Sequence, residues 1–379
     1  MAEGGVLLCD QRFAGCGSGQ VSCRPRLVLI GWRSFERLRC GCRGVNIAYA
    51  WAAGGKRSKG ARMVSPRVWL VVVGVAACAV IGASSASAVS AGPAVGRPGV
   101  VHELGLVGSP KVSSANDLFF HGGVGGVGVE TSPRVFLVLW GSQWTGNDPS
   151  GESALVQGFL SGVGGSSWLD SVTQYCQGVA SGTVYCNGAG QAAGNPKKGL
   201  LAGVWSDDGS PAPSHPKQSD LAAEAVRAAG YFGNITAAAN ASAQYVIATA
   251  SGNNPHGFGT KYCAYHTSTS SSFGDVAYTN LPYITDAGAS CGADFNGLGA
   301  NAGVTIVEGH EMAETITDQF PSGGWLDSNF AENGDKCAWI SSGQGAVQDI
   351  TLSTGTFPVQ SLWSNAFNGG SGGCVISYP

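Results

Sequence analysis

Short, unbroken apolar runs recur along the second two-thirds of the chain. The runs at 133–144, 243–249 and 275–284 read PRVFLVLWGSQW, AQYVIAT and DVAYTNLPYI, and a fourth at 198–207 reads KGLLAGVWSD. A continuous apolar run of this length, ended by Gly, Pro or polar residues, is typical of a strand buried on both faces. These four segments therefore predict the strands of a central sheet.

Segments with helical patterning lie between these runs, at 153–163, 166–175 and 219–230. The last is rich in Ala, begins at Ser219 or Asp220 as N-cap and ends at Gly230. Helices that alternate with buried strands predict an α/β or α+β domain with a mixed central sheet flanked by helices. Since no internal repeat and no domain boundary follows residue 115, we expect 115–379 to form one globular domain.

Charged residues are few and unevenly distributed. Only 12% of the 379 residues are charged and 60 are Gly, which predicts many tight turns and a weakly charged surface. Residues 1–62 hold 11 basic and three acidic residues, whereas residues 89–379 hold nine basic and 21 acidic residues, a net charge of −12. A body with this balance is not expected to bind nucleic acid or an anionic membrane through bulk charge.

An apolar segment at 63–88 has the order of a secretory signal peptide. Arg67 supplies a positive n-region, an apolar h-region follows it, and the small residues Ala-Ser-Ala form a cleavage site that ends at Ala88. We therefore expect a secreted, extracellular protein whose mature form begins at Val89 or slightly later and is not held in a membrane.

Residues 1–62 precede this signal, which predicts an N-terminal extension from a start codon assigned too early. Two alternatives to a cleaved signal are a single-pass anchor and a lipoprotein modified at Cys78. The h-region is short for a membrane span, and the residues after Cys78 stay apolar where a lipoprotein has a polar tether. The stretch 89–114 is rich in Gly, Pro and Ser, which is typical of a linker or a short pro-segment.

The cysteine count agrees with export. Six of the 12 cysteines lie beyond the signal, and an even set in an exported chain predicts three disulfides. Proximity along the chain favours the pairs Cys176–Cys186, Cys263–Cys291 and Cys337–Cys374. None of them lies in a C-x-x-C arrangement, which argues against a thiolate zinc site.

The segment 303–325 reads GVTIVEGHEMAETITDQFPSGGW and is one residue away from the zinc-protease pattern H-E-x-x-H. Gly303 and Pro321 bound an expected helix from Val304 to about Phe320. On a helix, His310 and Glu314 lie one turn apart on the same face and can meet one cation, with Glu311 beside them as a general base.

The alternative for this helix is an exposed acidic turn with an isolated histidine. Acids at 308, 311 and 314 are spaced three apart and repel one another unless a cation compensates them. We therefore favour a bound cation.

The motif resembles that of the gluzincin zinc proteases, the thermolysin-like class. Glu332 lies 18 residues beyond Glu314, and Asp335 follows it at three. The resemblance implies Glu332 as third zinc ligand and Asp335 as the residue that orients His310. Glu314 stands where the class has His, and the surroundings of Glu332 are rich in Gly and Asn rather than helical. Asp335 or His266 is therefore an alternative third ligand.

A second, looser resemblance spans roughly 118–374. Segments such as FFHGGVGGVGVETSPRVFLVLWGSQW and YVIATASGNNPHGFGTKYCAYHT resemble the phosphate-induced, EXORDIUM-like secreted proteins, and the retained His-Glu pair resembles their bacterial branch. This family is implicated in cell-wall growth, which implies an extracellular setting and wall polysaccharide as a partner.

Two functions from different classes follow from these patterns. The first is a zinc-dependent endopeptidase-like hydrolase that acts on protein or peptide, in which His310, Glu314 and Glu332 hold the metal and Glu311 moves the proton. The second is a non-catalytic, EXORDIUM-like wall-associated protein that keeps a structural cation at the same acids. Zinc with an open position suits the first, whereas calcium with six or more oxygen ligands suits the second.

Overall fold

The computed structural model of the protein describes residues 6–8, 26–28, 95–109, 117–209 and 211–377. The chain divides into two compact units, Met1–Ala83 and Ser84–Pro379. In the first unit, β1 (Val6–Leu8) pairs antiparallel with β2 (Arg26–Val28). The predicted signal at 63–88 lies outside the described residues, as does most of the extension at 1–62. Within the described ranges, no helix combines the length and the apolar character needed to cross a membrane.

The second unit is built on a seven-stranded sheet with the order β3-β11-β12-β10-β6-β9, in which β4 also pairs with β11. Strands β9, β6, β10 and β12 run parallel to one another, and β11 runs antiparallel to β12, so the sheet is mixed as predicted. The strands are β3 (Val95–Pro98), β4 (His102–Gly105), β6 (Arg134–Trp140), β9 (Leu201–Asp207), β10 (Ala243–Thr249), β11 (Tyr262–Ser271) and β12 (Gly274–Leu281).

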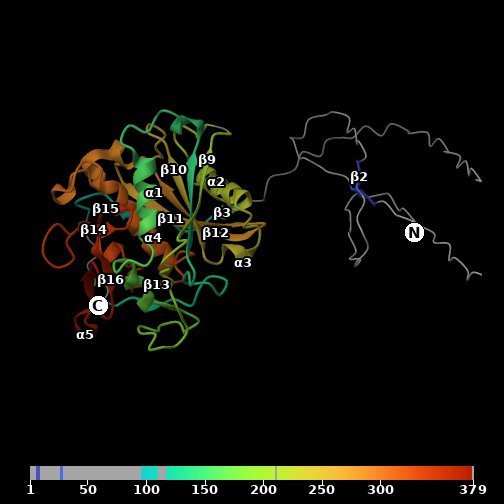
Figure 1. The fold of residues 1–379 in the computed structure, drawn as a ribbon. Coiled ribbons are helices and arrows are strands. Elements are labelled where there is room, and N and C mark those ends of the chain that lie inside the picture. Colours follow the sequence, from blue (N-terminus) through green and yellow to red (C-terminus); the bar gives the residue numbers. More distant parts are fainter. Residues whose placement is uncertain (1–5, 9–25, 29–94, 110–116, 210, 378–379) are drawn as a thin grey trace, which may run out of the picture. The chain divides into compact units, whose positions relative to one another are not determined.

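Helices cover both faces of this sheet (Figure 1). Along β6, Val135, Leu137 and Leu139 point into a core shared with α1 (Glu152–Gly162) and α4 (Ala302–Thr317). Their neighbours in β6 point into a second core shared with α2 (Gln218–Tyr231). Because both faces are covered, the central strands read as unbroken apolar runs rather than as alternating ones. The predicted α/β class with flanking helices is confirmed.

The predicted helices are present, with local differences. The helical segment expected at 166–175 is the 3-10 helix η2 (Leu169–Gln174). The N-cap of α2 is Lys217, two or three residues before the expected Ser219 or Asp220, and its backbone N–H donates to the Asp220 carboxylate at 2.9 Å. Helix α4 ends at Thr317, before Pro321, because the Asp318 carboxylate accepts backbone N–H groups of the turn at 322–324.

Shorter elements complete the unit. Two-stranded pairs join β5 (Phe119–Phe120) to β13 (Trp325–Leu326), β7 (Cys176–Gln177) to β8 (Gln191–Ala192), β14 (Gln348–Leu352) to β15 (Gly355–Val359), and β16 (Leu362–Ser364) to β17 (Gly373–Val375). The remaining helices are η1 (Ser142–Trp144), α3 (Ala237–Asn240), η3 (Ile284–Cys291), η4 (Phe295–Gly297), η5 (Asp335–Cys337) and α5 (Phe367–Gly370).

All three expected disulfides are present: Cys176–Cys186, Cys263–Cys291 and Cys337–Cys374. The second ties β11 to η3, and the third ties η5 to β17. Three disulfides are compatible with an oxidising, extracytoplasmic compartment.

Part of the stretch expected to be a linker or pro-segment adds to the sheet. Strand β4 pairs antiparallel with β11, and His102 lies directly opposite His266. The Gly-, Pro- and Ser-rich composition of 89–114 does not indicate these strands, because an edge strand of four residues leaves almost no period to detect.

Candidate metal centre

Helix α4 carries the His-Glu motif through the interior of the unit. It packs between β11 and β15, and all of its 16 residues are buried. An exposed acidic turn, the alternative considered for this helix, is therefore excluded. Buried carboxylates require compensation by protons, hydrogen bonds or cations.

His310, Glu314 and Asp335 form a first group of potential ligands. His310 Nε2 lies 3.0 Å from Glu314 Oε1 and 3.8 Å from Asp335 Oδ1. The backbone N–H of Asp335 donates to the same Glu314 oxygen at 2.8 Å, which holds the loop against the helix. One helical turn thus presents two ligands, as expected from the i, i+4 spacing.

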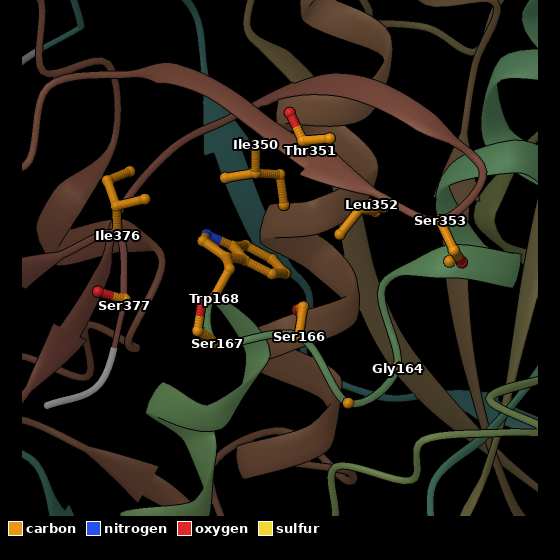
Figure 2. Close-up of a pocket in the computed structure, with 12 residues that line it drawn as sticks. Gly164, Ser166, Ser167, Trp168, Ile350, Thr351, Leu352, Ser353, Ile376 and Ser377 are labelled. Carbon is orange, nitrogen blue, oxygen red and sulfur yellow. The ribbon is translucent and has the colours of Figure 1, made fainter.

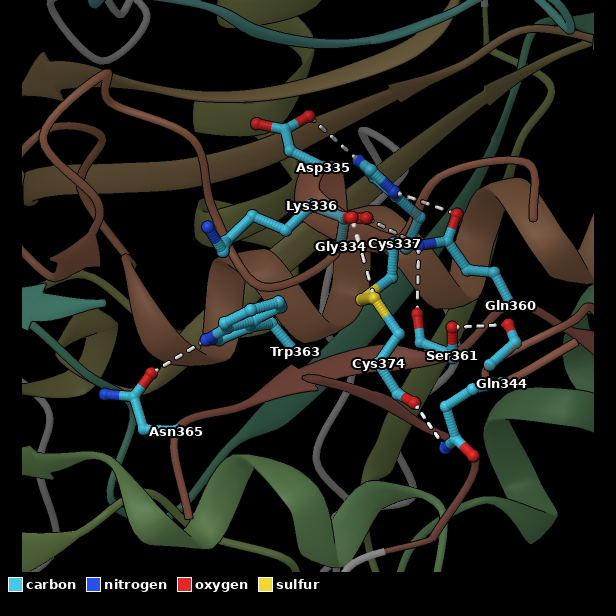
Figure 3. The surroundings of a disulfide bond; sticks show 12 residues. Gly334, Asp335, Lys336, Cys337, Gln344, Gln360, Ser361, Trp363, Asn365 and Cys374 are labelled. Carbon is cyan, nitrogen blue, oxygen red and sulfur yellow. Dashed lines mark hydrogen bonds and ion pairs between the residues drawn. A yellow bond between two sulfur atoms is a disulfide. The ribbon is translucent and has the colours of Figure 1, made fainter. Parts of the chain in front are cut away.

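Gln360 fixes the orientation of the His310 ring. Its side-chain N–H groups donate to the carbonyls of Gly334 at 2.8 Å and Ser361 at 3.2 Å, so its carbonyl oxygen faces His310 Nδ1 at 3.2 Å. Figure 3 shows Gln360 beside Gly334 and Ser361. Since Nδ1 donates to Gln360, Nε2 is left to present its lone pair to a cation, the arrangement usual for metal-bound histidines.

The loop after β13 approaches the helix closely at Gly334. A Cβ atom at this position would lie 2.7 Å from His310 Nδ1 and 2.8 Å from Glu314 Oε1, closer than side chains tolerate. Glycine is therefore required here by the close approach of the loop to both ligands.

A second group consists of His102, His266 and Glu332. Glu332 Oε2 lies 2.9 Å from His102 Nδ1 and 2.8 Å from His266 Nε2. The two histidines come from paired positions of β4 and β11, and Glu332 comes from the same loop as Asp335. Glu314 Oε2 lies 3.6 Å from His266 Nε2, so the two groups adjoin.

The side chain of Glu311 adjoins both groups. It forms a third group of potential ligands with His266 and Glu314, and both of its carboxylate oxygens are buried without a partner among the described residues. Burial is the main reason why the pKa of Glu311 rises to about 8, and the charge of Glu314 raises it further. The carboxyl of Glu308, one turn earlier, is also buried without a partner, and its pKa lies well above its usual value.

The electrostatic field of the centre favours positive charge. Burial lowers the pKa of His310, but Glu314, Glu311 and Asp335 together outweigh it and raise the pKa to about 10. The pKa of His266 rises to about 9 and that of His102 to about 10 for the same reason, with Glu332 as the main neighbour. Burial raises the pKa of Glu332, but His266 and His102 outweigh it and bring it below its ordinary value. Metal binding would displace protons from these rings.

The residues fit a divalent cation. Imidazole nitrogens and carboxylate oxygens are the donors that zinc accepts, and three donor atoms in each group lie within 4.8 Å of one another. Buried oxygens without a partner, at Glu311, Glu314 and Glu332, point to a missing positive charge. The six cysteines beyond the expected signal are engaged in disulfides.

The structure divides the expected ligands between the two groups. His310 and Glu314 lie together as expected, and Asp335, expected to orient His310, is the third member of their group. Glu332, expected to complete that group, lies with His266, the alternative ligand, and with His102. The sequence did not indicate His102 as a ligand, because the composition of 89–114 is typical of a linker.

The potential ligands are distinct from the residues that line a surface pocket of about 450 Å³, which Figure 2 shows. Trp168, Ile350 and Leu352 line it, and none of the potential ligands does. Its connection to the centre is indirect, because the Trp168 indole N–H donates to the backbone carbonyl of Gln360 at 2.8 Å.

Fold and site together define a mixed α/β protein with a buried histidine–carboxylate centre on a helix beside the sheet. No family model, no curated protein and no solved structure matches the chain. The likenesses to gluzincins and to EXORDIUM-like proteins therefore stay hypotheses.

The Cys337–Cys374 disulfide holds the loop that supplies Glu332 and Asp335. Figure 3 shows the residues around this disulfide. Lys336 anchors the same loop, because its ammonium group lies 3.1 Å from Asp327 Oδ2 and 4.2 Å from the centre of the Trp363 ring. Replacing both cysteines by Ser should lower the free energy of unfolding by about 2–4 kcal/mol and weaken zinc binding. Denaturant titration and zinc titration measure the two effects.

The matched control for this prediction is the double replacement of Cys176 and Cys186, which closes a shorter loop without a potential ligand. It should cost stability but leave zinc affinity unchanged. Equal zinc affinity in the two double variants would contradict a positioning role for Cys337–Cys374.

Proposed function

We propose that the protein is a secreted, zinc-dependent hydrolase of gluzincin-like type that cleaves peptide bonds. The observation that carries this proposal is the Glu311 carboxylate, which is buried beside His266 and Glu314 and has no hydrogen-bond partner in the part of the chain that the structure describes. A general base needs to be close to the reacting water and not bound in an ion pair. The three disulfides and the expected signal support export.

His310 and Glu314 would hold the cation, with Asp335 as the nearest third ligand and Glu332 as the other candidate. Three imidazoles among the donors favour zinc or a similar transition metal over calcium, which prefers six or more oxygen ligands. Bound zinc supplies a Lewis acid that polarises the scissile carbonyl and makes water more acidic.

Glu311 moves the proton in the proposed reaction. Its carboxylate accepts a proton from the attacking water while the water oxygen bonds to the carbonyl carbon of the peptide. The carbon–nitrogen bond then breaks, and Glu311 returns the proton to the leaving amine. The products are a carboxylic acid and an amine, and Glu311 ends the cycle ionised. The substrate approaches past Asp335, which at 19% exposure is the most accessible of the ligands.

One observation favours a second candidate function. The side chains of His310, Glu311, Glu314 and Glu332 are fully buried. A closed centre suits a structural cation in a non-catalytic, EXORDIUM-like protein of the cell wall, with wall polysaccharide as its partner. This candidate shares the cation with the first and differs in lacking turnover.

Metal analysis and a protease assay on the purified secreted protein test the proposal. We expect bound zinc, together with cleavage of casein and of internally quenched peptides that stops when 1,10-phenanthroline removes the metal. Re-addition of zinc should restore cleavage. A zinc-loaded protein without activity on any of these substrates would reject the hydrolase and favour the structural cation.

A further inference from the structure

We propose that the centre holds two cations, the second in a subsite made by His102, His266 and Glu332, with the Glu314 carboxylate bridging the two. The inference extends the proposed function but rests on donor geometry rather than on hydrolysis. It assigns a metal-binding role to His102, which lies far from the helix motif in the sequence.

The Glu314 carboxylate faces both groups. Its Oε1 atom lies 3.0 Å from His310 Nε2, and its Oε2 atom lies 3.6 Å from His266 Nε2. Oε2 is buried and has no hydrogen-bond partner among the described residues. A carboxylate whose two oxygens serve two adjacent cations is a usual bridge in two-metal sites, where the ions lie roughly 3.5–4 Å apart.

The second subsite has a complete donor set of its own. Two ligand atoms on one tetrahedral zinc, each at about 2.0–2.1 Å from the metal, are separated by roughly 3.3 Å. The separations of Glu332 Oε2 from His102 Nδ1 and His266 Nε2 are 2.9 and 2.8 Å, and Glu314 adds a fourth donor at 3.6 Å from His266. The other oxygen of Glu332 is buried and unpartnered, so it is also available.

The charge balance agrees with two cations. Four carboxylates belong to the combined groups: Glu311, Glu314, Glu332 and Asp335. With all four carboxylates ionised and neutral imidazoles as ligands, one divalent cation leaves two negative charges in a buried site, whereas two cations neutralise all four. Glu308 and Asp318 stand outside this count, because Glu308 is in no ligand group and Asp318 accepts backbone N–H groups.

The competing arrangement has one cation at His310, Glu314 and Asp335, with Glu332 accepting hydrogen bonds from two imidazoles. The two arrangements differ in stoichiometry. Chelator-treated full-chain protein is titrated with Zn²⁺ alone in a calorimeter, and bound zinc is counted by elemental analysis. We expect two zinc ions per chain in the wild type and one in His102→Ala. The control is His215→Ala, whose exposed ring stacks on His256 and contacts Asn254, and it should keep two.

Cobalt provides a readout that does not require a variant. Protein loaded with Co²⁺ should show magnetic coupling between the two ions in its electron paramagnetic resonance spectrum, since Glu314 bridges them. If His102→Ala fails to fold, this spectrum and the wild-type stoichiometry still distinguish one cation per chain from two. One zinc ion per wild-type chain, or two in folded His102→Ala, overturns the second subsite.

The outcomes separate this inference from the proposed function. A protein that binds one zinc and hydrolyses peptides retains the function and loses the second subsite. A protein that binds two zinc ions and hydrolyses nothing supports the subsite and rejects the hydrolase. Absence of zinc binding overturns both.

Discussion

Glu311→Gln should reduce peptide hydrolysis by about 10²–10⁴-fold while the protein keeps its fold and its zinc. Glutamine has nearly the same shape as glutamate but cannot accept and return a proton, and loss of a proton-transfer group typically has an effect of this size. The buried Glu311 oxygens have no hydrogen-bond partner among the described residues, so the replacement breaks no side-chain hydrogen bond there. Initial rates on a quenched peptide, together with zinc content and melting temperature, measure the three quantities side by side.

Glu308→Gln is the matched control for this variant. Glu308 lies one turn earlier on the same helix, is equally buried and also lacks a partner, but it belongs to no ligand group. Burial raises the pKa of the Glu308 carboxyl well above its usual value, and glutamine keeps the shape of this side chain. We expect unchanged rates for this control. Unchanged rates in Glu311→Gln as well, or a loss of zinc from that variant, would remove Glu311 from the role of base.

The parts of the fold that sequence could predict are those with a strong local pattern. Strands β6, β10 and β12 and helices α2 and α4 follow from unbroken apolar runs and helical spacing. Strand β11 could not be predicted, because its sequence YCAYHTSTSS is mostly polar. Seven of its ten residues are buried, through contacts with distant segments such as α4 and β4. Pairing between distant segments leaves no local period, so only the folded structure reveals it.

The candidate site also has one part that the sequence could predict and one part that it could not. His310, Glu311 and Glu314 are one, three or four residues apart on one helix, so their proximity could be predicted from helical geometry. The partners of Glu332 depend on the pairing of β4 with β11, which places His102 opposite His266. The role of Gln360 depends on a contact across 50 positions of the chain. Neither contact could be predicted from the spacing of residues along the chain.

Removal of the metal should lower the melting temperature by roughly 10 °C. A ligand that binds only the native state stabilises it by about 4 kcal/mol when its free concentration is a thousand times its Kd. In domains of 150–250 residues, each kcal/mol shifts the melting temperature by about 2–4 °C. In this protein the loss has a structural origin, because the buried carboxylates of Glu311, Glu314 and Glu332 would retain oxygens without a compensating partner.

Differential scanning calorimetry with and without EDTA measures this shift, and addition of excess zinc should reverse it. The control is Glu314→Ala, which removes the residue common to both ligand groups and should therefore melt at the same temperature in either buffer. EDTA does not reduce disulfides, so a lower melting temperature reports on the cation and not on Cys337–Cys374. A wild-type melting temperature that EDTA leaves unchanged would mean that protonated imidazoles, rather than a metal, compensate the buried carboxylates, and it would reject the metal centre on which both candidate functions depend.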